Sequence, residues 1–288
     1  MRYRGEVPAE VSSRFVEEGE AAKKPWVGWW WPRHPDVNPN NYDDGGPFQK
    51  YDQVYGTSAQ DWERTYTAST VDWWGHCWGW SNASILLDQP KATTKNGVFF
   101  SEDDMEALYT ELADSSIGYD EALTVLYIPP GPPTGAAGEE VDKYCDDLYR
   151  IISVTIGQER TAVQSDMRAV ATPPDRAEEV WNHGIYRYVA WFREAPGTGD
   201  ERLVEVTVGV WATSPARPPS IAALDRYEEY VCQLEFDAQG NVVTDSAQQN
   251  WLSASHYPPH DLVKLTGIVW QGANPYITRA NVDALYEP

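Results

Sequence analysis

The chain has 288 residues, of which 42% are hydrophobic and 23% are charged, a balance typical of a globular protein with a sizeable core. Its formal net charge of −22 would repel a phosphate backbone, which argues against a nucleic-acid partner. No apolar run is long enough to cross a membrane, and no apolar stretch follows the first residues. As written, the sequence predicts a cytoplasmic protein, or a secreted or delivered one if its N-terminus has been trimmed.

Composition divides the chain into an arm and two lobes. Residues 1–24 are polar and charged and are predicted to form an N-terminal arm. Residues 25–130 are predicted to form a helical lobe, and residues 139–288 a β-rich lobe. The Pro- and Gly-rich stretch 129–138 lies between the lobes and is predicted to be a surface loop or hinge. Helices followed by antiparallel strands indicate an α+β protein.

The first half of the chain contains one loop signal and two helix signals. Residues 25–72 are rich in Pro, Gly, Asn, Asp and aromatic side chains, and they predict an ordered loop that wraps around a core. Residues 77–87 predict a buried helix whose small side chains permit close packing. Ser101 is predicted to cap a second helix that runs to Asp114, because acidic residues follow it at the positive end of the helix.

The second half of the chain contains strand signals. Residues 151–156 are apolar and fit either the tail of a helix or a buried strand. Alternating β-branched and aromatic side chains predict strands at 185–192, 203–212 and 227–236. A hairpin turn is predicted at 237–241, where Asp, Gly and Asn follow one of these strands.

Cys77 is the strongest candidate for chemistry. It lies within Trp73–Trp80 (Trp-Trp-Gly-His-Cys-Trp-Gly-Trp) and begins a predicted helix. The unpaired N–H groups of a helix N-terminus stabilise a thiolate, which lowers the pKa of a cysteine from about 8.5 towards roughly 3.5–7.5. The backbone N–H of Cys77 is a candidate oxyanion-hole donor. The alternative is a structural cysteine in an aromatic cluster. Side chains predicted to line a cleft around the thiol are Trp74, His76, Trp78 and Trp80.

The other cysteines and the acidic loops suggest no second site. Cys145 and Cys232 lack such a setting and are interpreted as core or incidental residues, because three cysteines do not describe a disulfide framework. Residues 36–45 contain alternating oxygen ligands, but the calcium-loop pattern fails at Asn41 and Pro47. No zinc motif is present. The sequence therefore predicts no metal and no cofactor, and it leaves open whether a cation binds near residues 36–44.

Several segments resemble, in order, landmarks of the transglutaminase elicitor family, a papain-like group found in oomycetes and bacteria. Trp74–Trp80 resembles the nucleophile motif of the family, and Val180–Asn182 is similar to the surface motif that gives the family its name. The resemblance covers residues 25–265. Its other landmarks match residues 25–32, 50–52, 62–63, 97–101 and 251–261.

The resemblance implies a papain-like cysteine acyltransferase fold, in which a helical part that carries the nucleophile packs on an antiparallel β-rich part. It also implies transglutaminase chemistry: Cys77 attacks a glutamine side-chain amide, ammonia leaves, and the thioester passes its acyl group to an amine or to water. The implied partners are a protein or peptide glutamine donor and an amine acceptor. No oligomeric state follows from it.

The general base departs from the family pattern. The position of the family's catalytic histidine holds Tyr149, which has an ordinary pKa near 10 and is a poor base at neutral pH. The orienting acid of the family matches Asp166. The sequence predicts His183 as a substitute base, next to the predicted cleft residues Trp181 and Asn182. The remaining candidate bases are His76, His256 and His260.

Two other functions stay open at this point. A relative that has lost its base would be catalytically degenerate and would bind peptide or protein in an aromatic cleft. The same nucleophile could also serve a papain-like cysteine protease or amidase, because hydrolysis is the same acyl transfer with water as the acceptor.

Overall fold

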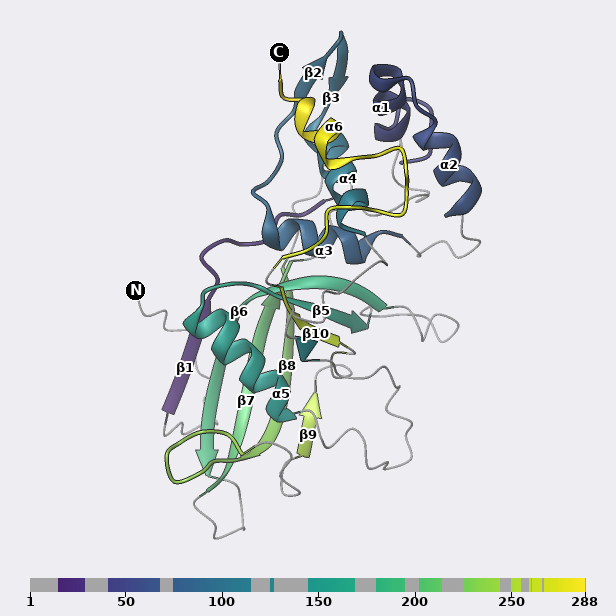
Figure 1. The fold of residues 1–288 in the computed structure, drawn as a ribbon. Coiled ribbons are helices and arrows are strands. Elements are labelled where there is room, and N and C mark those ends of the chain that lie inside the picture. Colours follow the sequence, from purple (N-terminus) through teal and green to yellow (C-terminus); the bar gives the residue numbers. More distant parts are fainter. Residues whose placement is uncertain are drawn as a thin grey trace.

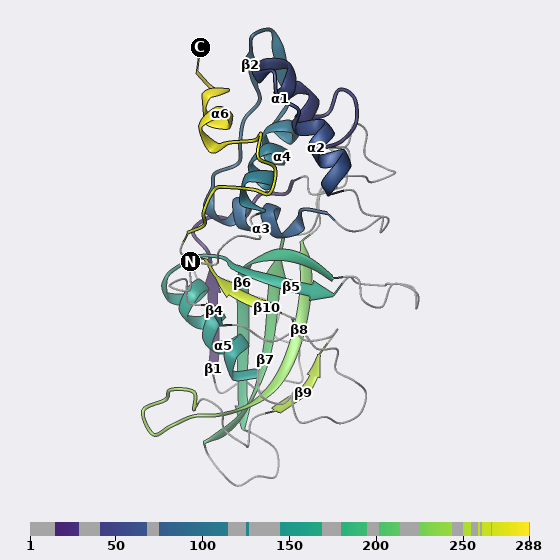
Figure 2. The ribbon, with the colours of Figure 1, turned by 45° about the vertical axis from the view of Figure 1, so that its right-hand side comes forward.

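The computed structural model has a helical part packed on one end of a twisted antiparallel sheet (Figures 1 and 2). This arrangement confirms the predicted α+β class. No helix among the described residues is long and apolar enough to span a membrane. The structure describes residues 15–28, 41–67, 75–114, 125–126, 145–168, 180–194, 202–213, 225–243, 250–254, 259, 261–265 and 267–287.

The helical part gathers segments from both ends of the chain around an aromatic core. Its central helix, α4, is buried along nearly its whole length, and a capping box of Ser101 and Asp104 begins it as predicted. Its elements are α1 (Pro47–Tyr55), α2 (Ala59–Tyr66), α3 (Cys77–Leu86), the hairpin β2 (Thr93–Lys95) and β3 (Val98–Phe100), α4 (Glu102–Ala113) and α6 (Arg279–Ala284).

The sheet has the strand order β4-β10-β5-β6-β7-β8-β9, and β1 also pairs with β6. The predicted strands at 185–192, 203–212 and 227–236 are confirmed as the centre of this sheet, and the first of them is longer than predicted. The strands are β1 (Phe15–Glu20), β4 (Val125–Leu126), β5 (Val163–Arg168), β6 (Val180–Glu194), β7 (Leu203–Ala212), β8 (Arg226–Glu235), β9 (Asn250–Ala254) and β10 (Asp261–Lys264).

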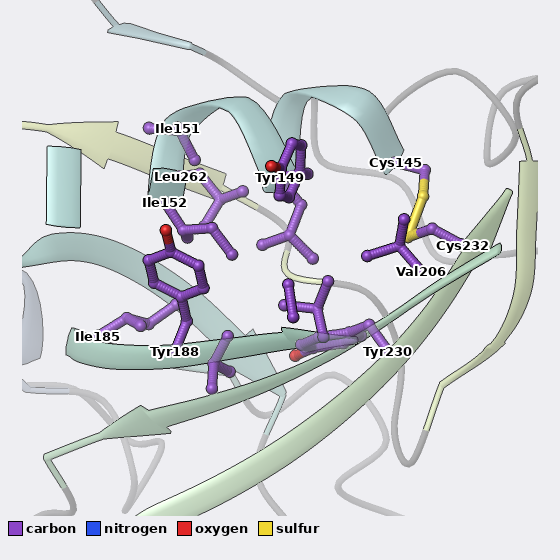
Figure 3. Close-up of a cluster of buried hydrophobic side chains, with 14 of the residues drawn as sticks. Cys145, Tyr149, Ile151, Ile152, Ile185, Tyr188, Val206, Tyr230, Cys232 and Leu262 are labelled. Atoms are coloured by element: carbon purple, nitrogen blue, oxygen red, sulfur yellow. A yellow bond between two sulfur atoms is a disulfide. The ribbon is translucent and has the colours of Figure 1, made fainter. Parts of the chain in front are cut away.

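One helix covers a face of the sheet. Helix α5 (Cys145–Ile152) continues into a π-helical turn (Ser153–Gln158), so residues 151–156 are the tail of a helix and not a strand. Its apolar side chains pack against Val206, Tyr188 and their neighbours on the central strands (Figure 3). This burial forms a second core, separate from that of the helical part.

The predicted loop at 25–72 is wrong over much of its length, because it contains α1 and α2. Pro47 lies in the first turn of α1, where a missing N–H costs nothing, and Gly56 ends the helix in the left-handed conformation at φ 66°. The carboxylate of Asp52 then accepts hydrogen bonds from the backbone of Ala59 at 2.7 Å and of Gln60 at 3.0 Å. The Pro and Gly signals therefore marked helix ends.

The predicted segment boundaries also need correction. Strand β1 lies in the predicted arm, yet it pairs along β6. The C-terminal residues 267–287 belong to the helical part: the hydroxyl of Tyr51 donates to the carbonyl of Tyr276 at 2.9 Å, and α6 contributes to the aromatic core. The predicted hinge at 129–138 lies outside the described residues.

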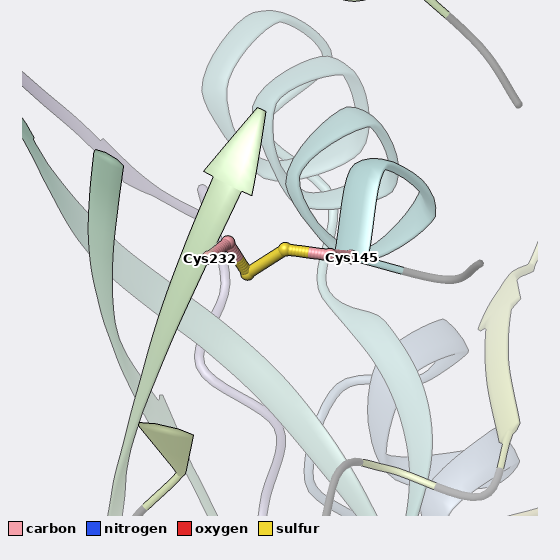
Figure 4. Close-up of a disulfide and its surroundings, with 2 residues drawn as sticks. All are labelled: Cys145 and Cys232. Carbon is pink, nitrogen blue, oxygen red and sulfur yellow. A yellow bond between two sulfur atoms is a disulfide. The ribbon is translucent and has the colours of Figure 1, made fainter. Parts of the chain in front are cut away.

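Cys145 and Cys232 are core residues, one of the two predicted alternatives, but they are not incidental, because they form a disulfide. The bond joins the first residue of α5 to β8, with the two Cα atoms 6.0 Å apart (Figure 4). The two cysteines are 87 positions apart in the chain, so only the packing of α5 on the sheet reveals that they pair.

Candidate active site around Cys77

Cys77 is the first residue of α3, at the start of the helix predicted from the sequence. It is a free, half-buried cysteine. Its sulfur accepts a hydrogen bond from Nδ2 of Asn182 at 3.4 Å, and Oδ1 of Asn182 accepts one from Nε2 of Gln164 at 3.0 Å. The fold thus brings together the two motifs that the sequence singled out, 105 positions apart.

The strands beneath α3 set the position of these side chains. In the pairing of β5 with β6, Asp166 lies opposite Asn182 and Gln164 lies opposite Gly184. Because side chains alternate along a strand, Gln164, Asp166 and Asn182 share one face of the sheet. The negative charge of Asp166 raises the pKa of the Cys77 thiol, so Asp166 lies near the sulfur. Its role as the acid that orients a base stays a prediction.

The pKa of the Cys77 thiol is raised, whereas the position at a helix start predicted a lowered pKa and a stabilised thiolate. Burial raises its pKa to about 11. Hydrogen bonds from the side chain and backbone of Asn182 lower the pKa, and the negative charges of Asp166 and Asp114 raise it further. The resting thiol is consequently protonated at neutral pH.

His183 does not face the thiol, which corrects its assignment as the base. Its Nδ1 donates to the carbonyl of Thr213 at 2.7 Å, and its Nε2 accepts from Arg226 at 3.2 Å. Burial and the charge of Arg226 lower the pKa of His183 to about 3, so the imidazole is neutral. Strand alternation places it on the opposite face of β6 from Asn182.

Tyr149 is remote from the thiol. Its hydroxyl donates to the carboxylate of Glu17 at 2.8 Å, and its ring packs edge-on against Phe192 and Phe236 in the core under α5. Burial and the charge of Glu17 raise the pKa of Tyr149, so its hydroxyl is no base. It fills the sheet core and carries no role at Cys77.

His76 belongs to a buried charged cluster. Its Nδ1 hydrogen-bonds Asp114, and carboxylate oxygens of Glu111 and Glu63 lie 3.5 Å and 4.0 Å from its ring nitrogens. Burial alone would lower the pKa of His76, but the charges of Asp114, Glu111 and Glu63 raise it to about 10. Neither His76 nor His183, the two histidines in the described part of the chain, contacts the sulfur.

The predicted cleft aromatics differ in placement. Trp80 is fully buried and its ring N–H donates to the carbonyl of Trp26 at 3.2 Å, so it is a core residue. Trp78 and Trp181 are partly buried and pack on hydrophobic clusters. Trp74, His256 and His260 lie outside the described residues.

The sequence did not identify Gln164, Glu63 or Glu111 as site residues, although residues 62–63 were matched as a landmark of the family. Gln164 could have been found, because it lies two positions before Asp166 on a strand and so shares its face. The two glutamates carry no local signal, since they come from α2 and α4 and meet only in the folded chain.

The structure resembles the crystal structure of the GP42 transglutaminase from Phytophthora sojae. The similarity has a TM-score of 0.60 and covers 96% of this chain and 91% of that chain, at 17% sequence identity. No family model matches the chain, and no curated protein matches it in sequence. The likeness confirms at the level of the fold the resemblance that the motifs indicated.

Proposed function

We propose that this chain, which has the fold of a transglutaminase, is a thiol acyltransferase that acts on glutamine side chains or other amides through a thioester on Cys77. The observation that supports the proposal is the contact between the half-buried thiol at the start of α3 and the amide of Asn182. The fold alone would support any function, because unrelated activities recur on one fold.

The reaction follows from these positions. The Cys77 sulfur, once it has lost its proton, attacks the carbonyl carbon of the amide and forms the C–S bond. The C–N bond breaks and the nitrogen leaves as ammonia after it gains that proton. A primary amine then attacks the thioester, the thiol is regenerated, and a secondary amide is released. Water in place of the amine gives hydrolysis.

Asn182 has a second task in this reaction. Its Nδ2 lies 3.4 Å from the Cys77 sulfur, and the backbone N–H groups at the start of α3 lie beside the same atom. As the sulfur adds, negative charge moves to the carbonyl oxygen, where these donors stabilise it. Gln164 fixes the amide of Asn182 in the orientation that directs Nδ2 to the site.

Asn182→Ala is expected to lower kcat about 100-fold to 1,000-fold, the usual loss for one oxyanion donor. The assay is incorporation of a fluorescent primary amine into a glutamine-containing peptide. Asn241→Ala, in the exposed turn after β8, removes the same side chain at a remote position and should leave the rate unchanged. Cys77→Ala should abolish incorporation. Activity that survives this substitution would refute the proposal.

Substitution of the histidines one at a time identifies the residue that accepts the proton of Cys77. His76→Asn, His183→Asn, His256→Asn and His260→Asn are compared in the same assay. Because the two described histidines have other partners, we expect loss of activity at His256 or His260 and folding defects at His76 and His183. A full rate in both the His256 and His260 variants would contradict this expectation.

A catalytically silent relative that binds peptide is the second candidate. The raised pKa of Cys77 favours it, because a protonated thiol is a weak nucleophile. One experiment separates the two functions. If the protein is silent, the unmodified chain and its Cys77→Ala variant bind the glutamine peptide equally well, and neither incorporates the amine.

The Cys145–Cys232 bond bears on where the protein works. Disulfides form and persist in oxidising compartments and are rare in the cytosol. The bond therefore favours the secreted or delivered alternative over the cytoplasmic one.

A further inference from the structure

Behind the start of α3 lies a cluster of buried metal-binding groups that the acyl-transfer chemistry does not use. Glu63 from α2, His76 at the cap of α3 and Glu111 from α4 each offer a ligand atom within 4.8 Å of the other two. All three side chains are more than nine-tenths buried, at 0%, 7% and 1% exposure.

Two atoms in this cluster are buried and lack a hydrogen-bond partner. They are Nε2 of His76 and Oε2 of Glu111. A buried polar atom without a partner costs about 1–3 kcal/mol, and more for a charged group, so a bound water or ion is expected beside such an atom. Histidine and glutamate are residue types that bind metals. Both atoms belong to the same three-residue cluster.

The outer atoms of these ligands are already held. Nδ1 of His76 hydrogen-bonds the carboxylate of Asp114. Asn274 donates from its side chain to Oε1 of Glu63 at 2.9 Å and from its backbone to Oε1 of Glu111 at 3.1 Å. Metal sites commonly have such a second layer, in which a carboxylate fixes the ligating histidine and amides fix the ligating carboxylates.

The charge of the cluster also calls for a cation. Glu63, Glu111 and Asp114 surround a single imidazole, and within the described part of the chain no lysine or arginine pairs with them. Three carboxyl groups outnumber the one imidazole, so even a protonated His76 balances only part of their negative charge, and unbalanced buried charge destabilises a fold. A divalent ion would balance it, and a mixed imidazole and carboxylate set suits zinc and its transition-metal neighbours better than Mg²⁺.

We propose that Glu63, His76 and Glu111 bind a divalent transition-metal ion such as Zn²⁺, with Asp114 and Asn274 as positioning residues. The ion lies in the helical part and joins α2, α4 and the start of α3, so it fixes the residue that precedes the nucleophile. Metal–ligand distances of about 2.1 Å require the three side chains to move slightly closer together on binding.

The test is calorimetric titration of Zn²⁺ into chelator-treated protein carrying Cys77→Ala, which removes the free thiol as a ligand. One ion per chain and a higher unfolding temperature are expected, with little response to Mg²⁺. Asn274→Ala should weaken binding about 10-fold to 100-fold. Absence of stoichiometric binding would overturn the proposal, whatever the outcome of the amine-incorporation assay.

Substitution of the proposed ligands tests whether the ion binds at this cluster. Glu63→Gln with Glu111→Gln should abolish binding without loss of the apo fold, because the double change removes buried negative charge. Glu106→Gln, on the same helix and equally buried against Gln89, should bind Zn²⁺ normally. Unchanged binding in the double variant would refute this location. The visible spectrum of the Co²⁺-loaded protein is a second measurement: a sulfur-to-cobalt band in protein with Cys77 intact would place the ion at the thiol instead.

Discussion

Removal of the Cys145–Cys232 disulfide is expected to lower the free energy of unfolding by about 4 to 5 kcal/mol, the loop-entropy value for a closure of this length. The bond spans 87 positions, so its loss returns much conformational freedom to the unfolded chain. It also anchors the start of α5, whose side chains Leu148 and Ile152 cover the sheet. Urea unfolding with and without a reductant measures the difference.

Single and double cysteine variants separate the contribution of the disulfide to stability from that of the packing of the two side chains. Cys145→Ala and Cys232→Ala each break the bond, so each should lower the free energy of unfolding by nearly the full amount expected for the disulfide, about 4 to 5 kcal/mol. The double variant should lower it by little more. Two losses that simply add would contradict a bond between them. Cys77→Ala is the control: its thiol is free, so the reductant should destabilise this variant as much as the unmodified protein.

Gly79→Ala is expected to destabilise the protein by about 1 to 3 kcal/mol, the usual range for overpacking a tight core. Helix propensity alone predicts the opposite, a gain of about 1 kcal/mol for alanine within a helix. A Cβ at Gly79 would lie 2.2 Å from the carbonyl oxygen of Thr110 and 2.6 Å from Cβ of Asp114. Both atoms belong to α4 or its end and cannot rotate away.

Thermal or urea unfolding gives the sign of this change. Ser81→Ala is the matched control in the same helix. The hydroxyl of Ser81 donates to the carbonyl of Trp78, and its loss should cost less than about 1.5 kcal/mol, the worth of one hydrogen bond. Any shift of α3 also displaces Cys77, so amine incorporation should fall in Gly79→Ala. A stabilised variant would mean that α3 and α4 pack less closely than the structure has them.

The sequence by itself determined those elements of secondary structure whose cause lies within one short segment of the chain. The cap at Ser101, the turn after β8 and the strand β7 depend on neighbours in the chain, and all three are found as predicted. The same logic failed between residues 25 and 72, because Pro and Gly act both in loops and at helix ends.

The candidate site was predictable only in part. Cys77 at a helix start and the motif at 180–182 were identified from the residues and from the resemblance, and the fold brings them into contact. The choice of His183 as base failed because a strand sends neighbouring side chains to opposite faces. Asn182 meets the Cys77 sulfur, whereas His183 is held by Thr213 and Arg226.

Tertiary structure alone decided the pairings between distant segments. The disulfide, the cluster of Glu63, His76 and Glu111, and the return of α6 to the helical part each join residues with no shared local pattern. It also decided the protonation of the thiol, since a helix start lowers a cysteine pKa while burial next to Asp166 and Asp114 raises it, and burial prevails here. Solvent exposure and nearby charge are properties of the packed chain, which is why the sequence could name the nucleophile but not its ionisation state.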